Sequence, residues 1–98
     1  MAPESRPDVT ASEIQALEIR SRIKQIIAGV AGLDPAKIPD HAALREGLHL
    51  DSLSLLRIEI DVDSTFELNL PDERYKEIQS LDEMVALVVH RLAGPEAV

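Results

Sequence analysis

A long run of helically spaced apolar residues opens the part of the chain that we expect to be ordered. These apolar residues recur at helical intervals: Ile14, Leu17, Ile19, Ile23, Ile26, Ile27 and Val30. Thr10 followed by Glu13 is typical of an N-terminal capping box, and Gly29 and Gly32 favour termination. The pattern predicts a first long helix that begins near Thr10 and ends between the two glycines.

A similar signature marks the last helix. Ser80 and Glu83 repeat the capping-box spacing, and Gly94 favours a stop. An apolar stripe follows one side of this segment at Leu81, Met84, Val85, Val88 and Leu92. Before it, residues 69–80 hold Pro71 at a favoured first helical position with acids beside it, which predicts one short helix.

The remaining pattern limits the architecture. No run alternates apolar and polar residues as a half-buried strand requires, so we predict an all-α fold. Residues 31–50 contain irregularly spaced apolar residues: Leu33, Ile38, Leu44, Leu48 and Leu50. We expect a long ordered loop there that closes one end of a small four-helix bundle, with three longer helices and one short helix. The bundle should occupy residues 10–93, between a disordered segment at 1–9 and a flexible tail at 94–98.

The segment 51–67 has two apolar faces where a surface helix needs one. The first spans roughly 80° at about 100° per residue and should pack on the other helices: Leu55, Ile58, Val62 and Phe66. The second spans roughly 60° and points elsewhere: Leu53, Leu56 and Ile60. Carboxylates border this second face at Glu59, Asp63 and Glu67. One interpretation is a helix buried on nearly all sides, but the acids favour a face that docks on an apolar patch with a basic rim.

Composition narrows the set of partners. The 98 residues include 18 Asp and Glu against 10 Lys and Arg, a net charge of −8, which argues against nucleic acid or anionic lipid. Residues 51–83 alone hold ten acids and three bases, a net −7. No apolar run approaches the roughly 20 residues that cross a bilayer, and we expect a cytoplasmic monomer. Because the chain has no cysteine, any thiol chemistry must arrive on a cofactor.

Ser52 stands where the second helix should begin. Asp51 before it is a suitable N-cap, and Ser54 follows closely. The positive end of the helix and its free N–H groups favour an anion by a few tenths to about 1 kcal/mol, so the position suits a phosphate esterified to Ser52. An Asp-Ser pair at a helix start is also explained by capping alone. The surrounding sequence therefore has to distinguish a simple helix cap from a site of phosphate attachment.

These surroundings resemble the acyl carrier protein family. The segment L-H-L-D-S-L at residues 48–53 is similar to the family's modification motif, in which the serine carries 4'-phosphopantetheine. Phe66 and then L-N-L-P-D-E at residues 68–73 keep the family's spacing. The similarity extends from about Ile19 to Leu92 and includes I-K-Q-I-I, G-L-D-P-A-K-I-P-D and S-L-D-E-M.

The resemblance implies a carrier that performs no catalysis. A phosphopantetheinyl transferase would attach 4'-phosphopantetheine from coenzyme A to Ser52, and the thiol of this arm would hold an acyl or aminoacyl group as a thioester. The partners would be that transferase, a loading ligase or synthetase, and downstream transferases. They would contact the second helix at Asp51, Leu53, Leu56, Arg57, Glu59, Ile60, Asp63 and Glu67. The bundle interior would shelter the cargo.

Two positions depart from the family's pattern. His49 stands three residues before the serine, where glycine is usual, and Arg57 stands five residues after it, where an acid is usual. A positive charge inside the docking face weakens its attraction to basic partners. We therefore expect a specialised carrier, for an unusual acyl or an aminoacyl group, and not the carrier of standard fatty-acid synthesis.

Other functions compete for the same residues. An acidic helical adaptor or inhibitor with no prosthetic group stays open, because every feature of the bundle persists without the arm. An enzyme is not expected, since Ser52, His49 and Asp51 are too close in sequence for a catalytic relay and no G-x-S-x-G motif is present. Residues 61–67 imitate the start of a calcium loop, but Phe66 replaces the required glycine, so no metal site is predicted.

Overall fold

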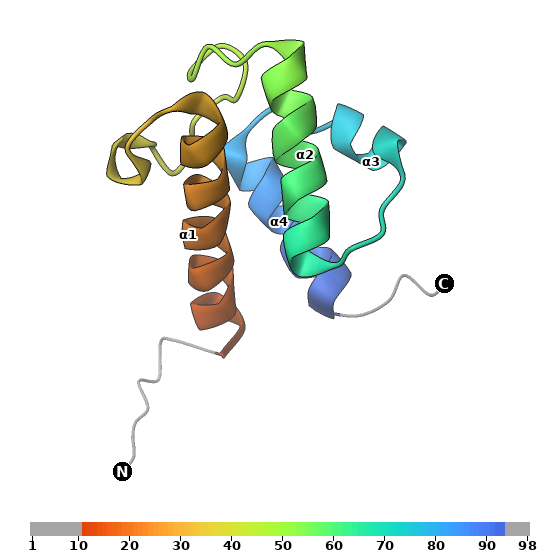
Figure 1. The fold of residues 1–98 in the computed structure, drawn as a ribbon. Helices are drawn as coiled ribbons and strands as arrows, with labels where there is room; N and C mark the ends of the chain where they lie inside the picture. Colours follow the sequence, from red (N-terminus) through yellow and green to blue (C-terminus); the bar gives the residue numbers. More distant parts are fainter. Residues whose placement is uncertain (1–10, 94–98) are drawn as a thin grey trace.

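Four α-helices form the bundle in a computed structural model that describes residues 11–93 (Figure 1). They are α1 (Ala11–Ala31), α2 (Ser52–Phe66), α3 (Asp72–Lys76) and α4 (Leu81–Ala93), and a short 3-10 helix, η1, spans Pro35–Lys37. The all-α class, with three longer helices and one short helix, is confirmed. The predictions of a Thr10 cap, a Gly94 stop and two flexible ends lie outside the described residues.

The core is aliphatic and lies where α1, α2 and α4 meet. α1 packs against both α2 and α4, and α2 runs back in the opposite direction to α1 (Figure 1). The largest fully buried side chains come from all three helices and from the segments that join them: Ile23, Ile27, Ile58, Val62, Leu68, Leu81, Met84 and Val88. Burial of one such side chain stabilises the fold by about 1.5–3 kcal/mol, so this cluster supplies the main favourable term.

The buried stripe of α1 is shorter than its apolar pattern. Ile19 and Ile23 are buried, whereas Ile14 and Leu17 are 48% and 64% exposed. At about 100° per residue, Ile14 and Leu17 project from a different side of α1 than Ile19 and Ile23 do. Their exposure agrees with this projection, so the buried stripe of α1 begins at Ile19.

The long loop closes the end of the bundle at which α2 begins. Ile38, Leu44 and Leu50 are buried and Leu48 is partly buried, which confirms the predicted plug. Leu33 is 40% exposed and takes no part in it, so that assignment was wrong.

An isolated antiparallel bridge fastens the loop to the start of α4. It pairs Ala43 with Ser80. The N–H of Leu44 donates to the carbonyl of Gln79 at 3.0 Å, and the N–H of Leu81 donates to the carbonyl of Ala42 at 2.9 Å. This pairing holds the loop residues around Ala43 in a fixed position near α2.

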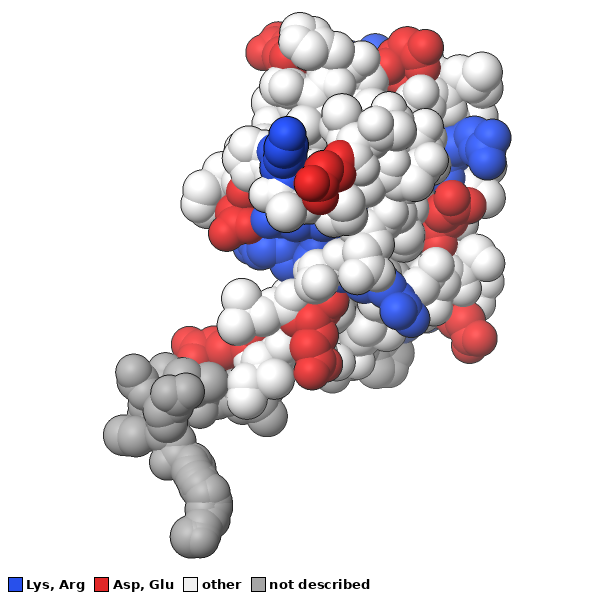
Figure 2. Space-filling model, turned by 60° about the vertical axis from the view of Figure 1, so that its left-hand side comes forward, with Lys and Arg blue, Asp and Glu red and all other residues white. Residues whose placement is uncertain are grey.

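Charged side chains hold the opposite part of the loop. Arg20 Nη1 donates to the carbonyl of Asp40 and to Asp82 Oδ1, both at 2.8 Å. Lys24 also pairs with Asp40, and His41 pairs with Asp82. The hydrogen bond with His41 and, to a lesser extent, the one from Arg20 lower the pKa of Asp82. Figure 2, which brings the α1 side forward, shows basic and acidic side chains interleaved, so the acidic surplus forms no continuous patch on this face.

The helix ends follow most of the predicted signals. Ser80 Oγ accepts a hydrogen bond from the N–H of Glu83 at 3.2 Å, as in a capping box. The Glu83 carboxylate accepts from the N–H of Gln79 at 2.6 Å, one residue before the expected donor. Pro71 was predicted to be the first helical residue of this segment, but it is the N-cap of α3, and the helix begins one residue later at Asp72. Within residues 11–93, none of the helices has the length and apolar character needed to cross a bilayer.

Candidate functional site

Ser52 is the first residue of α2, and its side chain is exposed at the corner between the long loop and the helix. Asp51 is the N-cap, as predicted, and its Oδ1 accepts a hydrogen bond from the N–H of Ser54 at 2.8 Å. This bond is the main reason that the pKa of Asp51 lies below its ordinary value. The Asp51 carboxylate therefore serves the helix start, and the Ser52 hydroxyl is left open to solvent beside the positive end of the helix.

Arg45 approaches Ser52 from the loop. Its Nη1 lies 3.4 Å from Ser52 Oγ, and both residues are exposed. A phosphodiester on Oγ would meet the Arg45 guanidinium and the helix N-terminus together, which is a suitable environment for its negative charge. The 4'-phosphopantetheine group thus fits these residues. Sequence reasoning missed Arg45, because six residues of irregular pattern separate it from Ser52 and only the fold brings the two side chains together.

His49 has a backbone φ of +56°, in the left-handed region that favours glycine. This conformation turns the chain from the loop toward the start of α2. The departure from glycine that the sequence shows here therefore has a structural cost, because a side chain at positive φ is strained by about 1–2 kcal/mol. His49 is exposed, so no burial offsets this strain.

The outer apolar face of α2 is open. Leu53, Leu56 and Ile60 are 68%, 46% and 57% exposed, whereas Ile58 and Val62 on the inner face are fully buried. The interpretation of α2 as a helix buried on nearly all sides is therefore wrong. We call the exposed set Leu53, Leu56 and Ile60 the outer face of α2. Arg57 and Glu67 are also exposed.

The structure assigns Asp63 to internal contacts. Its carboxylate accepts hydrogen bonds from the N–H of Asn69 at 3.2 Å, the N–H of Leu70 at 3.0 Å and the hydroxyl of Tyr75 at 2.8 Å. Burial, and to a lesser extent the hydrogen bond to Asp63, raises the pKa of Tyr75. Asp63 therefore ties the segment after α2 to α3.

A cavity of about 610 Å³ lies beside Ser52, between the loop, α2 and α3. Its wall includes apolar side chains from these three elements, from the segment after α3 and from α4: Leu44, Leu55, Leu56, Tyr75, Ile78 and Met84. Arg45 and Ser52 stand in the same wall. Glu59, which the sequence placed at the border of the outer face, is half-buried and also lines this cavity. The arrangement offers a partly apolar space next to the hydroxyl.

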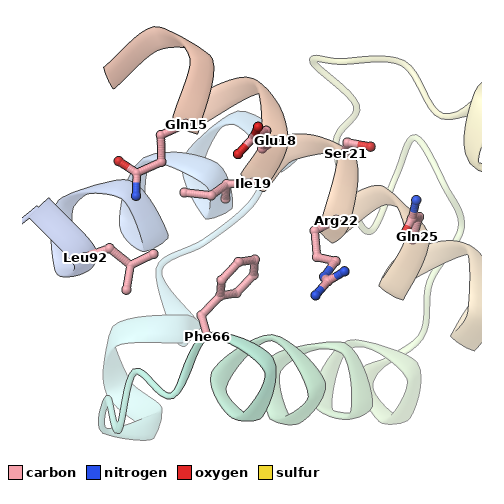
Figure 3. Close-up of a pocket in the computed structure, with 8 residues that line it drawn as sticks. All are labelled: Gln15, Glu18, Ile19, Ser21, Arg22, Gln25, Phe66 and Leu92. Atoms are coloured by element: carbon pink, nitrogen blue, oxygen red, sulfur yellow. The ribbon is translucent and has the colours of Figure 1, made fainter. Parts of the chain in front are cut away.

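A second cavity, of about 480 Å³, lies between α1, α4 and the last turn of α2 (Figure 3). Phe66 points into it from α2, Leu92 from α4 and Arg22 from α1. Phe66 follows Ser52 by fourteen residues, which is about 21 Å along the helix axis at the usual rise. This cavity therefore belongs to the far end of the bundle and is not part of the Ser52 site.

Comparisons with known proteins identify the family of this chain. Residues 21–88 match the family described as "Phosphopantetheine attachment site". The acyl carrier protein of Rubrobacter xylanophilus is 33% identical over 72 residues, which cover 74% of this chain and 89% of the relative. The meromycolate extension acyl carrier protein of Mycobacterium bovis is 28% identical over 71 residues, covering 72% of this chain and 62% of the relative. The fold is similar to that of acyl carrier protein from Enterococcus faecalis, with a TM-score of 0.64, 18% identity and coverage of 78% of this chain and 96% of the other.

The fold and the matched family define a carrier that bears a covalently attached prosthetic group. More specifically, the chain belongs to the acyl carrier protein family, and its cofactor is 4'-phosphopantetheine. Membership implies interaction with a phosphopantetheinyl transferase and with biosynthetic enzymes. The competing interpretation, an adaptor without a prosthetic group, has no support in these comparisons.

Proposed function

We propose that Ser52 carries the 4'-phosphopantetheine arm, whose thiol presents acyl or aminoacyl groups to successive enzymes as thioesters. The observation that supports this assignment most strongly is the exposed Ser52 hydroxyl at the start of α2, with Arg45 Nη1 3.4 Å from its oxygen. Arg45 and the first turn of α2 would hold the phosphodiester. The thioester chemistry is that of the arm, and the chain itself positions the arm and performs no catalysis.

The outer face of α2 is the proposed docking surface for these enzymes. Its exposed leucines and isoleucine offer an apolar centre, and Glu67 and Arg57 supply charges near it. A small surface of this kind supports fast association and easy release, which a carrier needs as it moves between a phosphopantetheinyl transferase, a loading ligase or synthetase, and downstream transferases. Arg57 favours partners that place a carboxylate opposite it.

The remaining parts of the proposal follow from this docking mode. Because every partner must reach the same face of α2, we propose that the chain works as a monomer. Because the arm comes from coenzyme A, we place the protein in the cytoplasm. The cavity beside Ser52 would shelter the cargo between encounters, since apolar side chains of α2 and α3 line much of it.

The test is transfer of the arm to purified apo protein. A broad-specificity phosphopantetheinyl transferase and coenzyme A should raise the intact mass by one phosphopantetheine. Ser52→Ala should block the gain completely, while Ser54→Ala, the control at the nearest other hydroxyl, should be modified like the parent. An unmodified parent, or a modified Ser52→Ala variant, would overturn the assignment.

A further inference from the structure

A carboxylate interrupts the apolar wall of the cavity beside Ser52. Glu59 follows Ser52 by seven residues, so at about 100° per residue both side chains lie on the same side of α2, about 10.5 Å apart along the axis. A smaller cavity of about 290 Å³ lies further along the helix. Leu56, Glu59 and Tyr75 line both spaces, so a group that extends from Ser52 along α2 meets Glu59 where the two cavities adjoin.

The surroundings leave the Glu59 carboxylate without a direct partner. Among residues 11–93, no side chain or backbone N–H donates a hydrogen bond to it, and no base lies within ion-pair distance. Partial burial raises the pKa of Glu59, and the nearby Asp72 carboxylate raises it further, against the opposing effect of Arg45 and Lys76. Glu59 is only half-buried, so water can supply its donors while the cavity is empty. Contact with a hydrocarbon chain would displace this water and leave a charged acceptor unsatisfied, which costs free energy.

We propose that this cavity selects cargo whose acyl chain carries a hydrogen-bond donor, an amino or hydroxyl group, which Glu59 accepts. A plain hydrocarbon chain would remove water from the carboxylate and return no hydrogen bond. A donor-bearing chain would bury its methylene groups against Leu55 and Ile78 and satisfy Glu59 with its polar end. The cavity wall thus sets the chemical class of the cargo. This inference rests on the proposed attachment of the arm at Ser52.

The experiment compares three matched arms on the same protein. Apo protein is loaded enzymatically with amide-linked coenzyme A analogues that end in hexanoyl, 6-hydroxyhexanoyl or 6-aminohexanoyl groups, and intact mass verifies each product. Thermal unfolding is followed by circular dichroism. At least one donor arm should raise the midpoint above that of the hexanoyl form by about 4–8 °C, the effect of one ordinary net hydrogen bond in a domain of this size. The other donor arm shows whether an amine or a hydroxyl is preferred.

Variants at Glu59 identify the acceptor. Glu59→Leu should abolish the advantage of the donor arms and favour hexanoyl. Glu59→Gln, which keeps an oxygen acceptor without the charge, should reduce the advantage of the amino arm most. Glu73 is an exposed carboxylate of α3 that lines neither cavity, so Glu73→Gln should leave the differences in unfolding midpoint between the three arms unchanged. If Glu59→Leu does not fold, the Glu59→Gln variant alone shows whether Glu59 is the acceptor of the hydrogen bond from the arm.

Two failures are distinguishable. If no analogue is transferred to the protein, the proposed function itself is wrong. If all three arms load but hexanoyl stabilises the protein as much as the donor arms, only the inference about cargo is overturned. The same holds if the donor advantage is unchanged in Glu59→Leu, or if the advantage of the amino arm is unchanged in Glu59→Gln.

Discussion

Removal of the Asp63 carboxylate should destabilise the bundle strongly, although a position beside the outer face of α2 would suggest a small effect. Asp63 accepts three hydrogen bonds, and those from the N–H of Leu70 and the hydroxyl of Tyr75 are partly buried. A hydrogen bond to a charged group contributes about 1.5–3 kcal/mol, but the three share one acceptor and are not additive. We expect Asp63→Ala to lower the free energy of unfolding by about 2–4 kcal/mol.

Urea unfolding followed by circular dichroism measures this loss, with Asp61→Ala as the control. Asp61 lies two residues earlier in α2 and is half-buried like Asp63, but its carboxylate forms no hydrogen bond or ion pair within residues 11–93. Its variant should therefore stay within about 0.5 kcal/mol of the parent. Tyr75→Phe removes one donor, and a double-mutant cycle of Tyr75→Phe with Asp63→Asn should show coupling of about 1 kcal/mol. The reasoning fails if Asp63→Ala unfolds like Asp61→Ala and instead weakens the binding of a partner enzyme.

Three further outcomes follow from the same structure. Ile60→Asp on the outer face should weaken transferase binding about tenfold or more with unchanged helix content, whereas Ile58→Ala should lower the free energy of unfolding by about 2–5 kcal/mol; equal unfolding by both would place the outer face in the core. His49→Gly should stabilise the protein by about 0.5–1 kcal/mol, because glycine relieves the positive φ at some entropic cost; a loss would mean that the imidazole makes a compensating contact. Tyr75 is the sole tyrosine, and its absorbance near 295 nm should show ionisation only above the pH at which free tyrosine titrates. Since its folded pKa is raised, stability should fall as pH rises above that ordinary value, and ionisation at the ordinary pH with the fold intact would contradict the Asp63 contact.

Local patterns were enough for much of α2. The spacing of apolar residues alone determines the two apolar faces, so Ile58 and Leu56 could be assigned to different sides of α2 before the packing of the other helices was known. The cap by Asp51 also depends only on adjacent residues, and it placed Ser52 at the helix start.

The features that sequence could not give depend on distant parts of the chain. Arg45 reaches Ser52 only because the bridge between Ala43 and Ser80 fixes the loop beside α2. The helical projection put Asp63 and Glu59 at the border of the outer face. Because α3 packs beside α2, Asp63 accepts internal hydrogen bonds and Glu59 stands in a cavity wall. Helical spacing carries no information about where α3 folds back.

The most direct measurement of the central claim is the position of the arm along the chain. Holo protein prepared with coenzyme A and a transferase would be digested, and the modified peptide fragmented by tandem mass spectrometry. Every fragment that carries the added mass should contain Ser52, and fragments that hold only Ser54 or Ser64 should show no added mass. Added mass on either of those two serines, with Ser52 unmodified, would contradict it.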